Sequence, residues 1–556
     1  MKPSTRETGH DLLTMAEGAL SAMEGLLADA VAHLRGRLTV EGHIVARLFD
    51  REQRATHMLA WLATYVEAIR QLIAYADRID AGGHLGEIEE LILRIGFGEY
   101  LAQIFGGIPM SQGEIGRLAD MGLTRNDVTG RMTPSVEALI ASGNTAQRRA
   151  RLVELLRAQH DCTPGTPGLD DTLEAIRDEM RKFAVSDVIQ QAQRWHLSNG
   201  YIPLDVINHM AELGVFGLAI PEEFGGMGLG KQAMCVVSEE LSRAYIGVGS
   251  LGTRSEIAAD LILHHGTAEQ QRQWLPKIAA GEVLPAVAFS EPNSGSDLGS
   301  VRTRAAADDG FYRVRGSKTW VTHAARADLL LILARTNQRE MNHRGLSLLL
   351  AEKPRARDDG QFSAAGLSGN EIPMVGYRGM KQYELAFDGF QVPISGLLGG
   401  IEGFGFKQIM QTLETARIQT AARAVGVAQS ALDQAVGYAV TRQQFGAPII
   451  GFPRIADKVA MMATEIAVAR QLTYFAAREK DSGARADAQA AMAKLLAARV
   501  AWAAADNSVQ VHGANGVAAE NPISRILADA RVLGIMEGSA EILAQVIARR
   551  LLERSN

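Results

Sequence analysis

A block of short strand-like runs lies between long stretches of helical periodicity, and this order limits the possible folds more than any other feature of the chain. Within residues 285–398, short apolar runs such as 329–333 are separated by glycine and charged turns, which is typical of strands. Alanine-rich stretches such as residues 484–511 have high helix propensity. The order predicts a mainly α protein with a small β domain at 285–398, a helical lobe at 169–284 before it and a C-terminal helical lobe at 399–556.

Residues 1–168 are predicted to form a separate helical N-terminal extension. In residues 13–34 and in two later stretches, apolar side chains recur at steps of three, four or seven residues, which places them on one helical stripe. Ser111 and Glu114 have the spacing of a capping box and predict the start of a further helix. Two Pro-Gly pairs in residues 163–168 favour turns and mark the linker to the rest of the chain.

Composition argues against several classes of protein. The 556 residues carry a formal net charge of -6, with 47% apolar and 22% charged residues, so there is no basic excess to attract nucleic acid or anionic lipid. Cys162 and Cys235 lie far apart, which argues against disulfides and structural zinc. The N-terminus lacks the apolar core of a signal peptide, and nowhere do about 18 uncharged apolar residues run together. We therefore expect a cytoplasmic protein without a membrane span, a nucleic-acid partner or a bound metal.

Residues 247–252 match the GxGxxG pattern of dinucleotide-binding turns. That pattern has physical meaning only between a strand and a helix, whereas residues 238–243 just upstream are a polar helical segment. We therefore interpret these glycines as flexible or close-packed backbone and not as a nicotinamide site.

Six short motifs resemble, in their order and spacing, those of the acyl-CoA dehydrogenase family. They are PEEFGG at 221–226, VAFSEPNSGSD at 287–297, KTWVT at 318–322, RQQFG at 442–446, QVHGANG at 510–516 and IMEGSAEI at 535–542. The resemblance covers about residues 171–552. It implies the family fold, which is a helical lobe, a middle β domain and a C-terminal four-helix lobe, here with the N-terminal extension added.

The resemblance implies that the cofactor is FAD. The residues that would contact its isoalloxazine ring, or the polar edge of that ring, are Ser290, Ser296, Trp320 and Thr322, and those that would hold the adenine and pyrophosphate end are Arg442, Phe445, Gln510 and Gly513. Further cofactor contacts are expected at Phe289, Gly295, Ser539 and Glu541. In the family the arginine–phenylalanine pair reaches the FAD of a neighbouring subunit, so we expect a homo-oligomer, either a dimer or a tetramer. The structural alternative is that Trp320 fills the β-domain core and that Arg442 is a solvated helix residue.

The resemblance also implies that Glu537 is the catalytic base. In the family the glutamate of this Glu-Gly-Ser/Thr motif removes the proton α to the thioester carbonyl, and its backbone N–H binds the thioester oxygen. A carboxylate with an ordinary pKa of about 4.3 is a weak base, and we expect burial beside the substrate to raise its pKa. Some relatives place the base just before an arginine on an earlier helix, but the residue before Arg417 is Ala416, which cannot accept a proton. The structural alternative is that Glu537 caps a helix or pairs with Arg531.

The residues expected to contact the acyl-CoA substrate are Thr253, Arg254, Ser296, Glu414, Arg417 and Gly538. In the family the floor of the acyl pocket is built from the segment that corresponds to residues 250–256. A buried Arg254 facing a hydrocarbon tail would be costly, whereas a substrate carboxylate would satisfy it, and Thr253 could add a hydroxyl donor. The alternative is that Arg254 points outward or pairs with Glu256.

One branch of the family carries a similar N-terminal extension and acts on a short, methyl-branched acyl-CoA that ends in a carboxylate. Resemblance to that branch implies (2S)-methylsuccinyl-CoA as substrate and mesaconyl-CoA as product, in the ethylmalonyl-CoA pathway, with an electron-transfer flavoprotein as electron acceptor. Three alternatives stay open: a dehydrogenase for another short branched substrate such as isovaleryl-CoA, an acyl-CoA oxidase, and a catalytically inactive helical interaction scaffold. The extension itself could stabilise a dimer, cover the substrate entrance or pack on the lobes.

Overall fold

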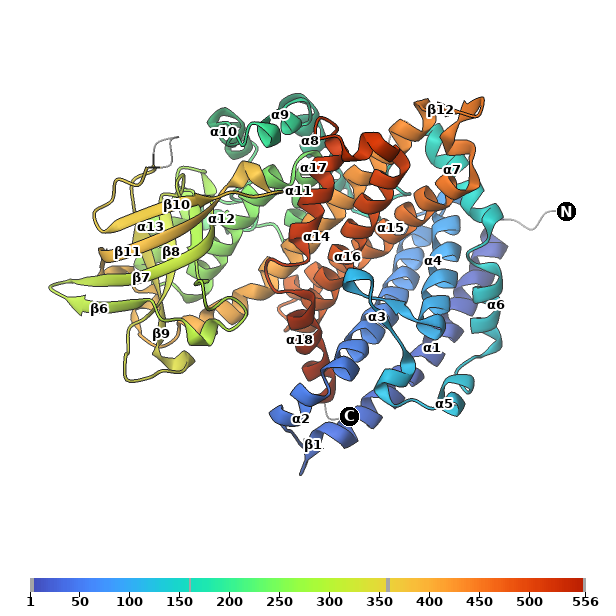
Figure 1. Ribbon diagram of the computed structural model, residues 1–556, viewed down its shortest axis with the longest axis horizontal. Helices are drawn as coiled ribbons and strands as arrows, with labels where there is room; N and C mark the ends of the chain where they lie inside the picture. The colour runs from blue at the N-terminus through green and yellow to red at the C-terminus, as the bar shows by residue number, and fades with distance from the viewer. Residues whose placement is uncertain (1–4, 160–161, 357–360, 554–556) are drawn as a thin grey trace. The chain divides into compact units, whose positions relative to one another are not determined.

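The structure is a computed structural model that describes residues 5–159, 162–356 and 361–553 (Figure 1). The chain divides into two compact units: unit 1 comprises Met1–Glu174 and Thr420–Asn556, and unit 2 comprises Ala175–Gln419. Helices dominate both units, and unit 2 contains a seven-stranded sheet. The predicted fold class, mainly α with a small β domain, is therefore confirmed, while the predicted domain boundaries stay a prediction.

In unit 1 the helices of the extension pack against those of the C-terminal lobe. The extension contributes α1 (Thr5–Leu38), α2 (Ala46–Arg51), α3 (Gln53–Ala81), α4 (Glu87–Gly106), α5 (Arg125–Thr129), α6 (Pro134–Ser142) and α7 (Ala146–Ala158). The lobe contributes the last part of α14 (Gly405–Thr441) together with α15 (Pro453–Asp481), α16 (Asp487–His512), α17 (Pro522–Leu533) and α18 (Ala540–Glu553). Figure 1 shows α3 and α4 beside α15, and α3 also packs along α16 and α18. Of the three predicted roles for the extension, packing on a lobe is the one that the structure displays.

A buried polar cluster joins the extension to the lobe. The rings of Tyr65 on α3 and Tyr100 on α4 stack with centroids 4.5 Å apart, and both side chains are buried. Across from them, Arg499 Nη2 on α16 lies 2.5 Å from Glu465 Oε1 on α15. Burial raises the pKa of both phenols, and the charges of Arg499 and Glu465 act on them. The stacked phenols of the extension and the ion pair of the lobe therefore interact electrostatically across the boundary between the two parts of unit 1.

The predicted linker is irregular backbone that hydrogen bonds fix to neighbouring helices. Tyr75 Oη on α3 donates to the carbonyl oxygen of Thr166 (2.6 Å), and the N–H of Thr166 donates to Glu89 Oε1 on α4 (2.8 Å). Gln471 Nε2 on α15 donates to the carbonyl oxygen of Pro167 (2.9 Å). Both glycines of the Pro-Gly pairs adopt the left-handed conformation, with φ 67° at Gly165 and 70° at Gly168.

The capping box predicted at Ser111 and Glu114 is wrong. Ser111–Gly113 form a short 3-10 turn between β3 (Ile108–Pro109) and β4 (Ile115–Gly116), which pair in an antiparallel hairpin. The reason is the left-handed backbone of Gln112 (φ 53°) and Gly113 (φ 77°), which reverses the chain before a helix can begin.

In unit 2 a sheet lies among helices that come before and after it in the sequence. The helices are α8 (Asp171–Phe183), α9 (Ile189–Leu197), α10 (Leu204–Glu212), α11 (Lys231–Ala244), α12 (Ile246–His265), α13 (Ala268–Ala279) and the first part of α14. The strands are β5 (Pro285–Ala288), β6 (Arg304–Asp308), β7 (Phe311–Thr322), β8 (Leu329–Arg335), β9 (Leu346–Glu352), β10 (Leu367–Ile372) and β11 (Gln382–Pro393). Their order in the sheet is β10-β11-β7-β6-β8-β5, with β9 paired to β8.

Both faces of β8 are buried, which explains its unbroken apolar run. Leu330 and Ile332 belong to a core with residues of β7 and β11. Leu329 and Leu331 point to the opposite face, where they meet residues of α12 and α13 such as Ile257. The sheet therefore provides a rigid support for α12, which carries two predicted substrate residues.

The GxGxxG pattern lies inside α12, so the dinucleotide-binding interpretation is excluded and the close-packing interpretation is confirmed. A Cβ on Gly249 would lie 2.0 Å from Ser242 Oγ, and one on Gly252 would lie 2.5 Å from Met234 Cε. Both contacts are to α11, so these glycines let two helices approach closely.

The described part of the chain contains no helix with the length and apolarity that crossing a membrane requires. The two cysteines, Cys162 and Cys235, are both free thiols.

Candidate active site

The predicted site residues fall in both units. Those of unit 2 are Thr253, Arg254, Phe289, Ser290, Gly295, Ser296, Trp320, Thr322, Glu414 and Arg417, and those of unit 1 are Arg442, Phe445, Gln510, Gly513, Glu537, Gly538, Ser539 and Glu541.

In unit 2 a buried ion pair fixes the loop that follows β5. Lys318 on β7 is 0% exposed, and its Nζ donates to the carbonyl oxygen of Phe289 (2.8 Å) and to Glu291 Oε1 (3.0 Å). The Glu291 carboxylate also accepts the backbone N–H groups of Arg302 and Thr303, both at 2.8 Å. It therefore closes the loop 291–303 on itself and ties the loop to β7.

This ion pair changes the pKa of both partners. Burial lowers the pKa of Lys318 to about 8, although the charge of Glu291 opposes the change. Burial acts to raise the pKa of Glu291, but Lys318 and the loop N–H groups hold it below its ordinary value. Glu291 therefore stays ionised as the centre of this network.

The closed loop presents small polar groups at its tip. The N–H of Thr319 donates to the carbonyl oxygen of Ser290 (3.0 Å), so Ser290 lies beside β7. Gly295 and Ser296 are exposed, and a Cβ on Gly295 would meet no atom within 4 Å. The tip thus offers a hydroxyl and uncovered backbone to a ligand.

A β-bulge turns Trp320 outward. In the pairing of β7 with β11, Tyr383 lies opposite Val321 and Leu385 opposite Lys318, so Thr319 and Trp320 share one partner position. Trp320 has a φ of 59°, and its side chain is 56% exposed. It does not fill the β-domain core, so this structural alternative for Trp320 is wrong.

Thr322 lies two residues further along β7. It is buried, and its hydroxyl donates to Gln382 Oε1 on β11 (3.0 Å). The oxygen of the same hydroxyl can also accept a hydrogen bond from a ligand.

Arg254 and Thr253 lie in the buried middle of α12. Arg254 is only 5% exposed, so it does not point outward into solvent. The hydroxyl of Thr253 donates to the carbonyl oxygen of Gly249 (3.3 Å), and it would have to leave this bond to donate to a ligand. Both residues are held by a helix that packs on the sheet.

Lys231 at the start of α11 binds the carboxylates that flank this part of α12. Its Nζ lies 2.9 Å from Glu256 Oε1 and 3.1 Å from Asp260 Oδ1. Burial would lower the pKa of Lys231, but the two carboxylates together raise it above its ordinary value. Glu256, the alternative partner for Arg254, thus has a lysine bound to its carboxylate.

The first part of α14 carries Glu414 and Arg417, which are both buried. Thr415 Oγ1 donates to Asp260 Oδ2 (3.4 Å), and Ser238 Oγ on α11 donates to Gln419 Oε1 (2.8 Å), so this part of α14 lies against α11 and α12. Ala416 packs in the apolar core of unit 2. The position before Arg417 therefore presents a methyl group and not a proton acceptor.

In unit 1 the ends of α14 and α16 meet and bring three predicted residues into one neighbourhood. The rings of Tyr438 and His512 stack with centroids 4.3 Å apart, and Asn515 Nδ2 donates to Tyr438 Oη (3.0 Å). Arg442 lies one helical turn after Tyr438, while Gln510 and Gly513 flank His512.

These residues are exposed on unit 1. Phe445 forms the turn between β12 (Gln443–Gln444) and β13 (Ala447–Pro448), with a φ of 51°, and is 94% exposed. Arg442 beside it is also exposed, and Gly513 has φ 60° and ψ -135° with open space around it. Only glycine adopts that backbone readily, so a ligand can approach the end of α16 closely.

Glu537 lies in the loop between α17 and α18. Its backbone is left-handed (φ 56°), and Gly538 follows with a φ of 100°. The buried Lys494 on α16 donates from Nζ to the carbonyl oxygen of Gly538 (2.5 Å). Ser539 precedes α18, and its hydrogen bond with Glu541 lowers the pKa of that carboxyl below its ordinary value. The loop is therefore held in a conformation that its non-glycine residue does not favour.

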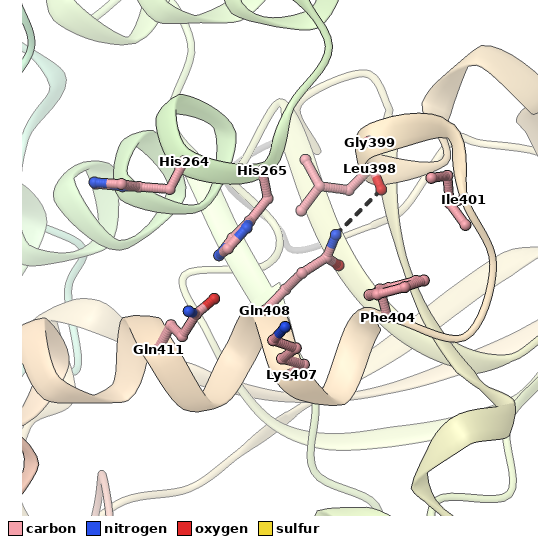
Figure 2. A pocket seen from close by; sticks show the side chains of 9 residues that line it. All are labelled: His264, His265, Leu398, Gly399, Ile401, Phe404, Lys407, Gln408 and Gln411. Carbon is pink, nitrogen blue, oxygen red and sulfur yellow. Dashed lines mark hydrogen bonds between the residues drawn. The ribbon is translucent and has the colours of Figure 1, made fainter.

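A separate cavity of about 400 Å³ lies in unit 2 between the end of α12 and the start of α14 (Figure 2). Its lining residues are His264, His265, Leu398, Gly399, Ile401, Phe404, Lys407, Gln408 and Gln411. Burial, together with the charges of His264 and Lys407, lowers the pKa of His265. None of the predicted site residues lines this cavity.

The exposed groups fit the chemistry of FAD. A flat aromatic side chain stands out from β7 beside loop hydroxyls, which suits an isoalloxazine ring. In unit 1 an exposed guanidinium lies beside an exposed phenyl ring and an open glycine, which suits a pyrophosphate and an adenine.

Three residues that hold the site were not predicted from the sequence: Lys231, Lys318 and Lys494. Lys494 carries a detectable signal, because it is a charged residue within the apolar run of an alanine-rich helix. Lys318 and Lys231 have no such signal, since their carboxylate partners come from distant segments.

Comparison with known proteins places most of the chain in one family. The family model for the acyl-CoA dehydrogenase N-terminal domain matches residues 170–282, that for the middle domain matches 286–390, and that for the C-terminal domain matches 403–552.

One curated relative and two solved structures are similar over large shares of the chain. The chain is 57% identical over 544 residues to (2S)-methylsuccinyl-CoA dehydrogenase from Cereibacter sphaeroides, across 98% of each chain. A chain from a structure of the electron transferring flavoprotein of Acidaminococcus fermentans matches with a TM-score of 0.66 and 32% identity, over 69% of this chain and 98% of that one. A chain from the glutaryl-coenzyme A dehydrogenase complex with glutaryl-CoA matches with a TM-score of 0.65 and 32% identity, over 69% of this chain and 96% of that one.

Proposed function

Because the chain belongs to the acyl-CoA dehydrogenase family and is thus an FAD-dependent oxidoreductase acting on CH–CH groups, we propose that it converts (2S)-methylsuccinyl-CoA into mesaconyl-CoA. The observation that carries this proposal is the similarity over 98% of both chains, which includes the N-terminal extension. The two chains therefore share the part that the family models do not match. We assign the reaction to the ethylmalonyl-CoA pathway.

Glu537 is the base in this proposal. Its carboxylate removes the α proton of the thioester, and its backbone N–H donates to the thioester oxygen, where negative charge develops. The left-handed backbone at Glu537 and the bond from Lys494 to Gly538 orient this carboxylate and N–H before the substrate arrives. Bound FAD would supply the acceptor for the hydride that leaves the β carbon.

In this proposal, two sets of residues hold the two ends of the cofactor. Trp320, Ser290, Ser296 and Thr322 take the isoalloxazine end, and the Lys318–Glu291 pair keeps their loop closed. Arg442, Phe445, Gln510 and Gly513 take the pyrophosphate and adenine end. An exposed Phe445 beside Arg442 suits the FAD of a second copy of the chain, so we propose a homo-oligomer.

Arg254 is the residue that selects the acyl group. Arg254 is buried, and a buried guanidinium interacts strongly with a carboxylate such as the distal one of methylsuccinyl-CoA. Lys231 binds the neighbouring Glu256 and Asp260, so it compensates part of their negative charge and weakens their repulsion of a substrate carboxylate. Glutaryl-CoA, the ligand of one solved relative, also ends in a carboxylate.

The electron acceptor is an electron-transfer flavoprotein in this proposal, supported by the likeness to a chain of such a structure. Ferrocenium reduction and peroxide formation, followed in parallel, separate a dehydrogenase from an oxidase. Rapid ferrocenium reduction with little peroxide supports the dehydrogenase, and stoichiometric peroxide would make the protein an oxidase.

Steady-state rates of the purified protein with (2S)-methylsuccinyl-CoA, isovaleryl-CoA and butyryl-CoA test the proposed substrate. We expect the highest kcat/KM for methylsuccinyl-CoA. A higher kcat/KM for either uncharged acyl group would overturn the substrate assignment and leave the reaction class intact.

A further inference from the structure

The loop that carries Glu537 needs support from outside its own sequence. Glu537 has a left-handed backbone, and Gly538 has a φ of 100°, which L side chains rarely adopt. Such a conformation persists only where the surrounding structure holds it. The loop leads directly into α18, so whatever fixes the position of α18 also fixes the C-terminal end of the loop.

Lys494 holds the middle of the loop. Its side chain is 1% exposed, and its Nζ lies 2.5 Å from the carbonyl oxygen of Gly538, the residue next to the base. The same ammonium group acts on Glu541 in the first turn of α18, where it helps to lower the pKa of that carboxyl. A buried ammonium has three donors to satisfy and therefore holds its acceptors firmly.

The extension holds the C-terminal end of α18. Arg35 on α1 donates from Nε to the carbonyl oxygen of Leu552 (3.2 Å) and from Nη2 to that of Leu551 (3.3 Å). These carbonyl groups belong to the last turn of α18, which has no partners for them within the helix. Beside them, the guanidinium of Arg549 lies 4.6 Å from the ring centroid of Phe49 on α2.

The extension also reaches the start of α18. The indole N–H of the buried Trp61 donates to His57 Nε2 (3.1 Å), so in the neutral ring the proton lies on Nδ1. His57 lies on α3, which packs along α18. Burial lowers the pKa of His57, and the Glu541 carboxylate in the first turn of α18 opposes that change. Contacts from α1, α2 and α3 therefore secure α18 at both ends.

We propose that the N-terminal extension positions the catalytic base, with Lys494 as the positioning residue inside the lobe and Arg35 and His57 as those of the extension. The proposal rests on the proposed role of Glu537 as the base. With α18 secured at both ends and Gly538 bound to Lys494, the carboxylate of Glu537 is held where it can meet the α proton. In this proposal the extension helps to hold the catalytic base in place and is more than an added domain.

The test uses the full-length, FAD-loaded protein with Lys494→Met, Lys494→Arg and Arg35→Met variants. Arg54→Met is the matched control, because Arg54 is an exposed extension arginine whose carboxylate partner, Asp120, also lies in the extension. A reacting group displaced by about 1 Å can lose on the order of 100-fold in rate. We therefore expect kcat to fall about ten- to a hundredfold in Lys494→Met and by a smaller factor in Arg35→Met, with KM and FAD content close to wild type. Lys494→Arg should recover part of the loss, and Arg54→Met should leave kcat unchanged.

The pH profile of kcat separates positioning from folding. A misplaced carboxylate changes its surroundings, so the apparent pKa of kcat should shift in Lys494→Met and Arg35→Met, whereas partial unfolding lowers kcat at every pH together with FAD content. If Lys494→Met does not fold, Arg35→Met and His57→Gln decide the question. Unchanged kcat and unchanged pH profiles in the folded variants overturn the proposal.

Glu537→Gln tells this failure apart from failure of the proposed function. If Glu537→Gln binds FAD and is inactive while the positioning variants behave as wild type, the base assignment stands and the support by the extension is wrong. If Glu537→Gln keeps its turnover, the base assignment itself is wrong.

Discussion

Replacing Arg254 by leucine should exchange the preferred substrate class. Arg254 is 5% exposed in the middle of α12, so its guanidinium is desolvated whether or not a substrate is present. Removing one partner of a buried charge pair costs about 3 to 5 kcal/mol. At about 1.4 kcal/mol per factor of ten, kcat/KM for (2S)-methylsuccinyl-CoA should fall roughly 140- to 3700-fold in Arg254→Leu. Isovaleryl-CoA has no distal charge to lose, so its kcat/KM should stay the same or rise.

The assay measures initial rates with ferrocenium as acceptor for both substrates, in wild type, Arg254→Leu and a control. Arg181→Leu is a suitable control, because Arg181 Nε also contacts a buried carboxylate of unit 2, Glu240 Oε2, at 2.9 Å, but it lies outside the predicted site. The control should change both substrates by the same factor. Parallel losses for both substrates in Arg254→Leu would refute the reasoning, because they would indicate a structural role for Arg254.

Three further perturbations follow from the structure. Gly538→Ala places a side chain at a φ of 100°, so we expect turnover to be lost while FAD content measured by absorbance stays near wild type. Lys318→Met leaves Glu291 buried without its lysine, and urea unfolding should report a loss of about 3 to 5 kcal/mol. The pKa of Lys318 is lowered from 10.5 to about 8, so between pH 8 and pH 10.5 the unfolded chain binds more protons than the folded chain. The free energy of unfolding of wild type should therefore rise with pH in that range, and Lys318→Met should lack this rise. Arg499→Met breaks the buried pair with Glu465 and should lower the urea midpoint of unit 1 without changing kcat of the folded fraction; an unchanged midpoint would contradict the role given to this pair.

The pattern of residue types predicts the secondary structure well where it extends through a whole element. The stripe at residues 13–34 lies within α1, the apolar run at 329–333 lies within β8, and the stretch at 484–511 nearly coincides with α16. The helical surroundings of the GxGxxG pattern are visible in the sequence, and they correctly argue against a dinucleotide-binding turn. The capping box at Ser111 failed because the left-handed backbone of Gln112 reverses the chain, and a glutamine gives no warning of that.

The site could be predicted from motifs only as a set of residues and not as a geometry. The bulge that exposes Trp320 depends on its pairing with β11, about 60 residues later in the chain, so no local pattern indicates it. The lysines behind the site lie far in sequence from the groups that they bind: Lys494 is 44 residues from Gly538, and Lys318 is 27 residues from Glu291. Such contacts depend on which distant segments the fold brings together. Neither composition nor periodicity predicts which segments those are.

Anaerobic mixing of the FAD-loaded protein with (2S)-methylsuccinyl-CoA tests most directly whether Glu537 drives oxidation of this thioester. Wild type should bleach the oxidised flavin absorbance in a single turnover and yield mesaconyl-CoA, identified by mass spectrometry. Glu537→Gln should bind the same ligand and keep its flavin oxidised. Bleaching by Glu537→Gln at a rate near that of wild type, or no bleaching of wild type by this substrate, would contradict the account.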